Sequence, residues 1–415
     1  MRKLIYGALL LTACHASGET TPSDAATTQP KTAGAAPSLE TRPANVPSQK
    51  PAFAGQTRAP EAKSNVAFEV ETVASGLEKP WAVDFLGDGR FVVTEKPGRL
   101  RVIMPDGRIL PPVAGVPQVD ARGQGGLLDV TVRREGPGTT LCLTYAEPRE
   151  GGKNGTAAMC GQAVGKENIA LESTRVVFRQ RPDWESTGHY GSRLVFAPDG
   201  KMFITTGERQ KPEPRQLAQS LDTTLGKVVR LEPVGMSPPG NPFYDAKNPG
   251  SPRSQIWSYG HRNIQSAAIN PATGALWTVE HGPKGGDELN IPQAGKNYGW
   301  PIITYGQDYD GKPIGEGITA KAGMEQPVYY WDPVIAPSGM AFYTGDKFPA
   351  WKGSLFLGGL GSQKLVRLAL KGNRVVGEEW FPMNARIRDV AQGPDGYLYL
   401  VDETNGKLLR LRPKA

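Results

Sequence analysis

The sequence is poor in cysteine and histidine, and it contains no apolar run long enough to cross a membrane. Among its 415 residues there are 3 cysteines and 4 histidines. A membrane-spanning helix needs about 20 consecutive apolar residues, and the run Leu4–Leu11 near the N-terminus is much shorter. Helix signals are also sparse along the rest of the chain. We therefore expect neither a membrane-spanning protein nor a mainly helical one.

Runs of basic residues are absent as well. Lys and Arg number 48 against 41 Asp and Glu, which gives a formal net charge of +7. Proteins that bind nucleic acid usually gather their basic residues on one face or along one helix. Here the basic residues are scattered among acids, which indicates a solvated surface. No nucleic-acid partner is expected.

The N-terminus has the pattern of an export signal. Two basic residues precede the apolar run Leu4–Leu11, and Leu11-Thr12-Ala13-Cys14 follows it. A short apolar run after basic residues is typical of a cleaved signal peptide, and the tetrapeptide resembles a bacterial lipobox, whose cysteine becomes the lipidated first residue. We predict a lipoprotein-type signal peptide over 1–14, with Cys14 as the lipidation site. An ordinary signal peptide with a chance cysteine is the alternative.

Residues 15–65 have the composition of a linker. From Ala16 to about Asn65 the chain is mostly Ala, Thr, Pro, Ser and Lys, with almost no large apolar residues. Such a stretch buries too little surface to offset its ordering entropy. We predict a disordered tether over 15–65 that joins the lipid to a folded domain over 66–415. Because His15 rather than an aspartate follows the cysteine, the periplasmic side of the outer membrane is the expected location.

The other two cysteines, Cys142 and Cys160, lie in apolar segments that have the pattern of strands. A turn at Gly151 and Gly152 lies midway between them. Antiparallel pairing about that turn places the two cysteines opposite each other, and an exported protein permits a disulfide. The bond would close a loop of about 17 residues, worth roughly 3 kcal/mol in the chain-entropy model. Two buried thiols are the alternative.

One sequence motif recurs along the predicted folded domain: an apolar strand, a turn with Asp-Gly or its equivalent, and a second apolar strand. Asp-Gly between apolar runs is a strong hairpin signal. Copies spaced roughly 45 to 80 residues apart suggest blades of four strands each. The six copies begin near Val83, Leu128, Leu194, Ala268, Met340 and Val390.

This repetition predicts an all-β fold, a six-bladed β-propeller of four-stranded antiparallel blades. Radial repetition removes exposed sheet edges once the ring closes. We expect the strand at Phe68–Val73 to pair with the last blade near Lys407–Leu411 and so close the ring. A two-sheet sandwich is the alternative, and the number and spacing of the copies favour the propeller.

Three histidines beyond the export segment, His189, His261 and His281, lie beside glycines next to repeat strands. In a propeller such loops open on the funnel around the central channel, where a ligand is held. Glu208 ends the strand next to His189. A carboxylate beside an imidazole fixes its tautomer and raises its basicity, and a neutral histidine is a good general base. A structural histidine at a strand end is the alternative.

Arginines in these loops suit an acidic ligand. Arg262 and Asn263 combine a rigid donor fork with an amide, which fits a planar carboxylate. Arg386 and Arg388 alternate along a strand and therefore share one face, where they suit an anion with several carboxylates. The alternatives are a turn arginine paired with a nearby carboxylate and a pair of exposed arginines.

The segment Glu280–Asn290 combines acids with Gly and Pro. Carboxylates and backbone carbonyls are the hard oxygens that calcium prefers, six to eight at a time. Asn297–Pro301 follows closely and offers another carbonyl. An acidic surface loop is the alternative.

Together these phrases resemble the soluble PQQ-dependent aldose sugar dehydrogenases of the glucose/sorbosone dehydrogenase family (PQQ, pyrroloquinoline quinone). The most specific part runs from Gly260-His261-Arg262-Asn263 to Asn297-Tyr298-Gly299-Trp300-Pro301. Gly123–Leu128, the His189 phrase and Arg386–Asp389 occur in the family order. The resemblance, over about Val66 to Pro413, implies an oxidoreductase that converts aldoses such as glucose to lactones, with PQQ and Ca²⁺ as cofactors.

The resemblance also implies a role for each matching residue. His189 takes the proton of the anomeric hydroxyl while a hydride passes to PQQ, and Glu208 orients the histidine, although relatives often carry Asp there. The other matches are contacts to PQQ by Gln124, Arg262, Asn263, Arg386 and Arg388, carbonyls of Gly282 and Pro283 that hold calcium on PQQ, and Glu288 and Tyr298 at a second, structural calcium.

One position departs from the family pattern. Gly361 stands where some relatives carry a lysine against PQQ, and Lys364 reaches that place only if the loop has a different shape. We still count Gly361 as a cofactor-binding position, and we expect the affinity for PQQ or the redox potential of bound PQQ to differ from that of those relatives.

Two other functions are weighed against the dehydrogenase. A calcium-dependent lactonase-type hydrolase needs acids and Asn gathered on one central metal, whereas this chain aims arginines at an anion. A non-catalytic binding module has no need of the histidine and arginines kept here. For the dehydrogenase we expect an aldose substrate, a quinone or cytochrome as electron acceptor, a monomer, and membrane contact only through the lipid.

Overall fold

A computed structural model describes residues 37–135 and 138–414. The predicted signal peptide, Cys14 and residues 15–36 of the predicted tether lie outside the described residues. Within the described part, no helix has the length and hydropathy needed to span a membrane. The helices there are single turns: α1 (Pro212–Arg215), α2 (Pro252–Gln255) and the 3₁₀ turns η1 (Glu150–Gly152), η2 (Gln216–Gln219) and η3 (Pro349–Trp351).

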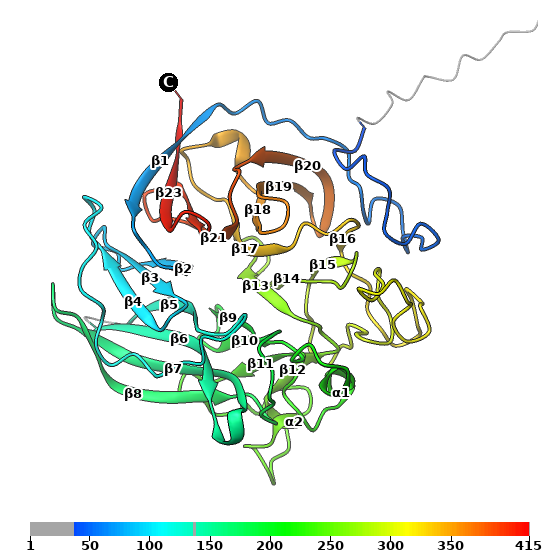
Figure 1. Cartoon of the computed structure of the whole chain (residues 1–415), viewed down its shortest axis with the longest axis horizontal. Helices are drawn as coiled ribbons and strands as arrows, with labels where there is room; N and C mark the ends of the chain where they lie inside the picture. Colours follow the sequence, from blue (N-terminus) through cyan, green and yellow to red (C-terminus); the bar gives the residue numbers. More distant parts are fainter. Residues whose placement is uncertain (1–36, 136–137, 415) are drawn as a thin grey trace, which may run out of the picture. The chain divides into compact units, whose positions relative to one another are not determined.

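The strands of the described residues form six antiparallel sheets arranged as the blades of a propeller (Figure 1). Blade 1 contains β2 (Pro80–Phe85), β3 (Phe91–Glu95) and β4 (Arg99–Ile103); blade 2 contains β5 (Leu127–Glu135), β6 (Gly138–Pro148), β7 (Asn154–Val164) and β8 (Ala170–Arg179); blade 3 contains β9 (Gly191–Phe196), β10 (Met202–Thr206), β11 (Lys227–Leu231) and β12 (Ile256–Tyr259). Blade 4 contains β13 (Ile264–Ile269), β14 (Leu276–Glu280), β15 (Asp287–Asn290) and β16 (Tyr329–Trp331); blade 5 contains β17 (Pro337–Phe342), β18 (Leu355–Gly359), β19 (Lys364–Lys371) and β20 (Arg374–Pro382); blade 6 contains β21 (Ile387–Gln392), β22 (Leu398–Asp402), β23 (Lys407–Pro413) and β1 (Phe68–Ser75).

The six-bladed propeller is therefore confirmed, and so is the closure of its ring. β1 pairs with β23 from Phe68↔Pro413 to Ser75↔Lys407, so the first strand completes the last blade. The first strand of each blade contacts the first strands of both neighbouring blades, in the circular order β2, β5, β9, β13, β17, β21. These inner strands surround the axis, and loops at their ends face the central channel.

The prediction of four strands in every blade is wrong for blade 1, which has three among the described residues. The segment after β4 follows that strand: the N–H of Leu110 donates to the carbonyl of Val102, and Ala114 then bridges to Ala170 in blade 2. Pro111 and Pro112 interrupt this segment. Proline lacks the N–H that a regular ladder requires, so the fourth position is irregular.

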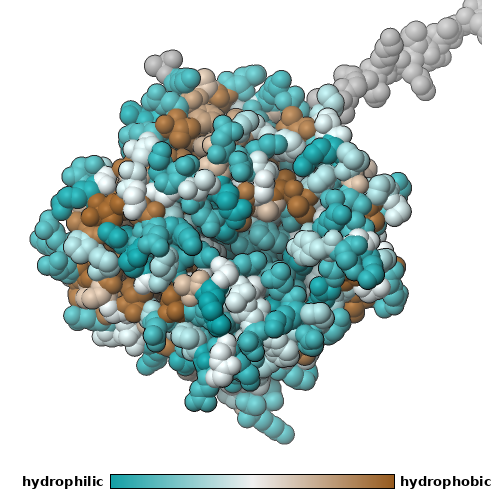
Figure 2. All heavy atoms as spheres, viewed as in Figure 1, coloured by the Kyte–Doolittle hydropathy of each residue, from teal (hydrophilic) through white to brown (hydrophobic). Residues whose placement is uncertain are grey.

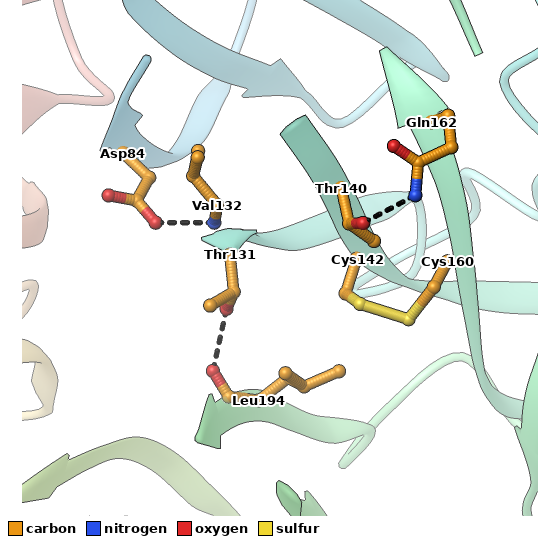
Figure 3. The surroundings of a disulfide bond; sticks show 8 residues. All are labelled: Asp84, Thr131, Val132, Thr140, Cys142, Cys160, Gln162 and Leu194. Atoms are coloured by element: carbon orange, nitrogen blue, oxygen red, sulfur yellow. Dashed lines mark hydrogen bonds between the residues drawn. A yellow bond between two sulfur atoms is a disulfide. The ribbon is translucent and has the colours of Figure 1, made fainter. Parts of the chain in front are cut away.

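The disulfide is confirmed. Cys142 on β6 and Cys160 on β7 are direct partners in the ladder, and their sulfur atoms are bonded (Figure 3). Apolar side chains fill the spaces between neighbouring blades; Trp277 of blade 4 and Leu357 of blade 5, for example, belong to one buried cluster. The face seen in Figure 2 is mostly hydrophilic, which agrees with the predicted solvated surface.

Residues 37–62, here called the strap, correct the tether prediction over 15–65. The strap lies against the outer side of blades 4 and 5 (Figure 1). Ala59 is 1% exposed and Gln56 0%, and Glu61 forms a parallel bridge to Glu378 in β20. The composition is that of a linker, but its few polar and small residues have specific partners on the propeller, and those contacts offset the ordering entropy.

Candidate functional site

A cavity of about 200 Å³ lies at the end of the channel where the inner strands begin and the second strands of the blades end. Residues at the start of inner strands and residues just after second strands both reach it. This cavity, here called the central cavity, is lined by Trp81, Lys96, Gly123, Gln124, Leu128, Tyr190, Gly191, Gln265, His281, Leu360, Arg386, Arg388 and Glu403.

Three of the predicted cofactor contacts, Gln124, Arg386 and Arg388, line the central cavity. His189 lies beside it, because Tyr190 and Gly191 line the wall and the His189 N–H donates to Oε1 of Gln124 at 2.8 Å. The sequence-based proposal that these loops meet at one end of the channel is thus supported by geometry.

His189 and Glu208 form a buried pair. Nδ1 of His189 lies 3.1 Å from Oε1 of Glu208, and the two side chains are 4% and 1% exposed. With Nδ1–H donated to the carboxylate, the lone pair of the imidazole lies on Nε2. Burial, with a smaller contribution from Arg262, lowers the pKa of His189 to about 4, against the opposing pull of Glu208. The histidine is therefore neutral near pH 7 and able to accept a proton.

The backbone at His189 is held in an unusual conformation. Its φ of 48° lies in the left-handed region, which costs a non-glycine residue on the order of 1 kcal/mol. Arg209 supports it, because its guanidinium donates to the carbonyls of Gly188 at 2.6 Å and Ser186 at 2.8 Å. The same guanidinium stacks 3.7 Å from the ring centre of Tyr190. Sequence reasoning missed Arg209, which holds the loop that presents the histidine.

Arg262 and Asn263 leave donor atoms without partners. Nη1 of Arg262 donates to the carbonyls of His281 at 3.0 Å and Gly282 at 2.7 Å, while Oδ1 of Asn263 accepts from the N–H of Gly191 at 3.1 Å. Nε of Arg262 and Nδ2 of Asn263 are buried and have no hydrogen-bond partner among the described residues. Buried donors without partners are rare in folded proteins, so these two atoms suit a ligand with acceptor oxygens.

Arg386 and Arg388 converge on one carboxylate. Nε of Arg386 lies 3.2 Å and Nη2 of Arg388 2.9 Å from Oε2 of Glu403. Although burial opposes it, the two arginines hold the pKa of Glu403 below its ordinary value. The predicted common face of the two arginines is therefore present, with an acid between them that the sequence did not reveal.

Lys96 adds a third cation to the central cavity. Its Nζ donates to the carbonyl of Gly123 at 2.8 Å, and burial together with Arg388 lowers its pKa. Gly361, the predicted cofactor-binding position, does not itself line the central cavity, whereas its neighbour Leu360 does. Lys364 does not reach in, because its Nζ lies 3.6 Å from the ring centre of Trp380 on the outer part of blade 5.

The loop Gly282–Gly286, here called the carbonyl loop, is folded very tightly. A Cβ atom at Gly282 would lie 2.2 Å from the Gly286 oxygen and 2.3 Å from the Gly285 oxygen. The carboxylate of Asp287 accepts the N–H groups of Gly282, Ile335 and Ala336 at 2.8 to 2.9 Å. Burial raises the pKa of Asp287 to about 7. The loop gathers backbone oxygens, the donor type that calcium accepts.

Beside the carbonyl loop is a small cavity of about 10 Å³, the space of roughly one water molecule. Glu280, Glu288 and Tyr298 line it. Burial and the nearby Glu280 raise the pKa of Glu288 well above its ordinary value, and Oδ1 of Asn290 has no partner among the described residues. Nδ2 of Asn290 donates to both carboxylates at 3.1 Å, so the Oδ1 of that amide faces away from them. The two carboxylates beside a space of this size suit a divalent cation.

Within residues 37–135 and 138–414, no group of three or more His, Cys, Asp or Glu side chains gathers in a way that would hold a metal ion. A cation at the carbonyl loop or beside Glu288 would therefore depend on backbone oxygens. His261 is a structural histidine. Its Nδ1–H donates to Oε1 of Glu280 at 2.9 Å, its Nε2 lies 2.9 Å from the hydroxyl of Ser258, and the side chain is fully buried.

Sequence comparison adds an independent finding. Residues 77–410 match the family model described as Glucose / Sorbosone dehydrogenase. The protein "Aldose sugar dehydrogenase YliI" of Escherichia coli (strain K12) is 44% identical over 351 residues, which cover 83% of this chain and 93% of that protein.

Solved structures are similar over the same extent. The soluble aldose sugar dehydrogenase of Escherichia coli in the apo-form shares 43% identity with a TM-score of 0.79, covering 84% of this chain and 100% of its own. The PQQ-bound form of aldose sugar dehydrogenase from Streptomyces coelicolor shares 28% identity with a TM-score of 0.67, covering 84% of this chain and 99% of its own.

Proposed function

Because this chain belongs to the glucose/sorbosone dehydrogenase family, we propose that it oxidises aldose sugars at the anomeric carbon to lactones, with PQQ as cofactor and His189 as the base. The observation that carries the proposal is the buried His189–Glu208 pair beside a cavity lined by three cations. A neutral base next to an anion-binding cavity is what the removal of a proton and a hydride from a sugar requires.

Proton removal is the step of the reaction that a side chain of the protein carries out. Nε2 of His189 accepts the proton of the anomeric hydroxyl, and the hydride leaves the anomeric carbon, so that the C–O single bond becomes the lactone carbonyl. Glu208 keeps the proton-accepting nitrogen on the substrate side and stabilises the imidazolium that forms. Bound PQQ supplies the quinone that accepts the hydride.

The proposed contacts to the cofactor are argued from the charges of the site and from its hydrogen-bond donors without partners. PQQ carries three carboxylates, and the site offers Arg262, Arg386, Arg388 and Lys96 against two acids, Glu403 on the cavity wall and Glu208 paired with His189. Nε of Arg262 and Nδ2 of Asn263 provide two further donors that have no partner among the described residues. Gln124 touches both the His189 backbone and the cavity, which suits a residue shared by cofactor and substrate.

Calcium has two proposed sites. The carbonyls of Gly282 and Pro283 would hold one ion against the cofactor, where it would polarise a quinone oxygen as a Lewis acid. Glu288 and the backbone of Tyr298 would hold a second, structural ion in the small cavity, where it would offset the repulsion between Glu280 and Glu288. Gly361 would border the cofactor only through its neighbour Leu360.

The cellular setting is proposed from the N-terminus. Residues 1–14 would be a lipoprotein-type signal peptide and Cys14 the lipidated residue, with residues 15–36 as the tether to a domain that starts with the strap. The enzyme would then act as a periplasmic monomer on the outer membrane and pass electrons to a quinone or cytochrome. The disulfide between Cys142 and Cys160 agrees with an oxidising compartment.

The test is reconstitution of the purified full chain with PQQ and calcium, followed by dye reduction with glucose and other aldoses. We expect activity that needs both additions. His189→Ala should lower kcat by about 10²- to 10⁴-fold while PQQ still binds, as seen in its absorbance. Absence of PQQ binding in the unaltered chain, or full activity in His189→Ala, would contradict the proposal.

A further inference from the structure

The strap lies outside the residues that match the family model. The family model matches residues 77–410, whereas the strap spans 37–62. It nevertheless has specific contacts with blade 4, and these contacts converge on the two segments that enclose the carbonyl loop. Those contacts indicate a role beyond covering an apolar surface.

The first of these segments ends at Asp332, just after β16. The carboxylate of Asp332 accepts the N–H of Asn45 at 3.0 Å and its Nδ2 at 2.7 Å. It also accepts the N–H of Val46 at 3.3 Å, and Nη2 of Arg58 donates to the carbonyl of Asp332 at 2.8 Å. Asp332 is buried at 6% exposure, so the strap satisfies most of the polar groups of this residue.

Asp332 and its neighbour touch the carbonyl loop directly. A Cβ atom at Gly285 would lie 2.8 Å from Oδ1 of Asp332, the same oxygen that binds Asn45. The N–H of Gly286 donates to the carbonyl of Trp331 at 2.9 Å. The strap therefore fixes one wall of the loop.

The second segment, residues 304–307, forms another wall of the carbonyl loop. The N–H groups of Lys284 and Gln307 exchange hydrogen bonds with each other's carbonyls at 3.0 and 3.1 Å. The strap holds this wall as well: Nε2 of Gln49 donates to the carbonyl of Thr304 at 3.2 Å, and the hydroxyl of Tyr305 lies 3.1 Å from Oε1 of Gln56. Both walls of the carbonyl loop are thus tied to one continuous stretch of chain.

We propose that the strap is a positioning element that holds the carbonyl loop in the geometry that binds calcium. This inference rests on the proposed function, because it names what sets the affinity of one of its sites. Backbone oxygens bind calcium well only when they are held at one point, and outer-shell groups that orient ligands typically change metal affinity by about 10- to 100-fold. The strap thus supplies an outer shell for this loop.

The experiment compares two arginine variants of the full chain. Arg58→Ala removes the bond to Asp332, together with the bonds of Arg58 to the carbonyls of Glu40 and Arg42. Arg374→Ala is the matched control, because Arg374 binds the strap at the carbonyl of Ala54 and stacks on Phe53 but has no contact with either wall. Asn45→Ala provides a second, smaller change at Asp332. Calcium alone is titrated, and its binding is followed by hydrogen exchange at the amide of Lys284, a residue that does not line the cavity beside Glu288. Exchange at Gly286, which lines that cavity, is compared only in the metal-free chain.

We expect Arg58→Ala and Asn45→Ala to speed exchange at Lys284 and Gly286 in the metal-free chain and to raise the calcium Kd measured at Lys284 on the order of tenfold. Arg374→Ala should leave both quantities within about twofold of the unaltered chain. Equal effects of Arg58→Ala and Arg374→Ala, or unchanged exchange in Arg58→Ala, would overturn the inference. If the unaltered chain takes up no calcium, the calcium part of the proposed function fails, and the metal-free exchange rates still decide whether the strap positions the loop.

Discussion

At the scale of single residues, the site depends on a histidine kept neutral inside the protein. Burial lowers the pKa of His189 to about 4, and Glu208 fixes its tautomer without being protonated, since the pKa of Glu208 stays below its ordinary value. Burial first raises the pKa of that carboxyl, and His189 and Arg262 more than reverse the effect. Burial thus keeps the imidazole unprotonated and able to accept a proton, and it lowers the base strength of the ring at the same time.

The depressed pKa gives a prediction with a definite sign. An unfolded histidine has a pKa near 6.5 and the folded His189 one of about 4, so below pH 6.5 the unfolded chain takes up a proton that the folded chain does not. The contribution of His189 to the free energy of unfolding should be fully present above pH 6.5. It should fall by roughly 3 kcal/mol as the pH decreases toward 4. Urea unfolding at several pH values measures it.

The matched control is His189→Gln, which removes the titrating group. Its free energy of unfolding should change less between pH 6.5 and pH 4 than that of the unaltered chain. Identical pH dependence in the two proteins would show that His189 titrates normally, and the assignment of a neutral base would then be wrong.

Lys96 carries the second residue-scale prediction. Its ammonium lines the central cavity with one carbonyl partner, Gly123, at 2.8 Å, so Lys96→Met should weaken binding of the anionic cofactor by about 1 to 2 kcal/mol, or 5- to 30-fold. Lys364→Met is the control, because Lys364 stacks on Trp380. Titration of the apo chain with PQQ by fluorescence quenching gives both Kd values; equal losses would rule out a specific role for Lys96.

At the scale of elements, most of the architecture was predictable because hairpin signals are local. The turns at Asp88-Gly89, Asp199-Gly200 and Asp395-Gly396 each join the first two strands of a blade, as predicted. The His189–Glu208 pair was also predictable, because the end of one strand and the start of its neighbour meet in a hairpin.

Residues that meet across different blades were harder to predict. Lys96 and Glu403 each follow the second strand of a blade and point into the same cavity, a place equivalent to that of Glu208 in blade 3. A search of the residues that follow each second strand would have found them. Nothing in the composition of the strap could reveal its contacts, because the partners of Asn45 and Arg58 are nearly 300 positions away in the sequence.

The disulfide carries the prediction for the blade as an element. It joins neighbouring strands of blade 2 at the pair Cys142↔Cys160, and neither cysteine lines the central cavity. Replacing both cysteines by alanine should lower the free energy of unfolding by about 3 kcal/mol through the entropy of the unfolded chain. Urea denaturation of the variant measures the loss, and KM for the sugar should stay unchanged. A change in KM would show that blade 2 is coupled to the site.

At the scale of the whole molecule, the ring is joined at its centre by charge as well as by apolar packing. Arg193 on β9 pairs with Asp129 on β5 at 2.9 Å and with Asp389 on β21 at 2.9 Å, and its Nε donates to the carbonyl of Gln265 on β13 at 3.0 Å. Its guanidinium also stacks 4.3 Å from the ring centre of Trp81 on β2. One side chain therefore contacts the inner strands of four other blades.

Further hydrogen bonds link the inner strands in sequence. Figure 3 shows Oδ2 of Asp84 accepting the N–H of Val132, and Thr131 donating to the carbonyl of Leu194. Blades 1, 2 and 3 are thus connected edge to edge. Because Trp81 and Gln265 also line the central cavity, the same network forms the floor of the proposed cofactor site.

Arg193→Met tests whether the ring behaves as one unit. Removing one partner of a buried ion pair leaves uncompensated carboxylates and typically costs about 3 to 5 kcal/mol, here at Asp129 and Asp389 together. Since Arg193 contacts five blades in total, counting its own, we expect the loss to appear as a lower midpoint of a single urea transition, seen alike by tryptophan fluorescence and by far-UV circular dichroism. Separate transitions by the two probes would mean that the blades unfold independently and that closure by β1 and β23, rather than the central arginine, holds the ring. The double variant Arg193→Met/Asp129→Asn tests the cause of the loss. If the unpaired carboxylate of Asp129 destabilises Arg193→Met, neutralising that carboxylate should recover part of the lost free energy of unfolding.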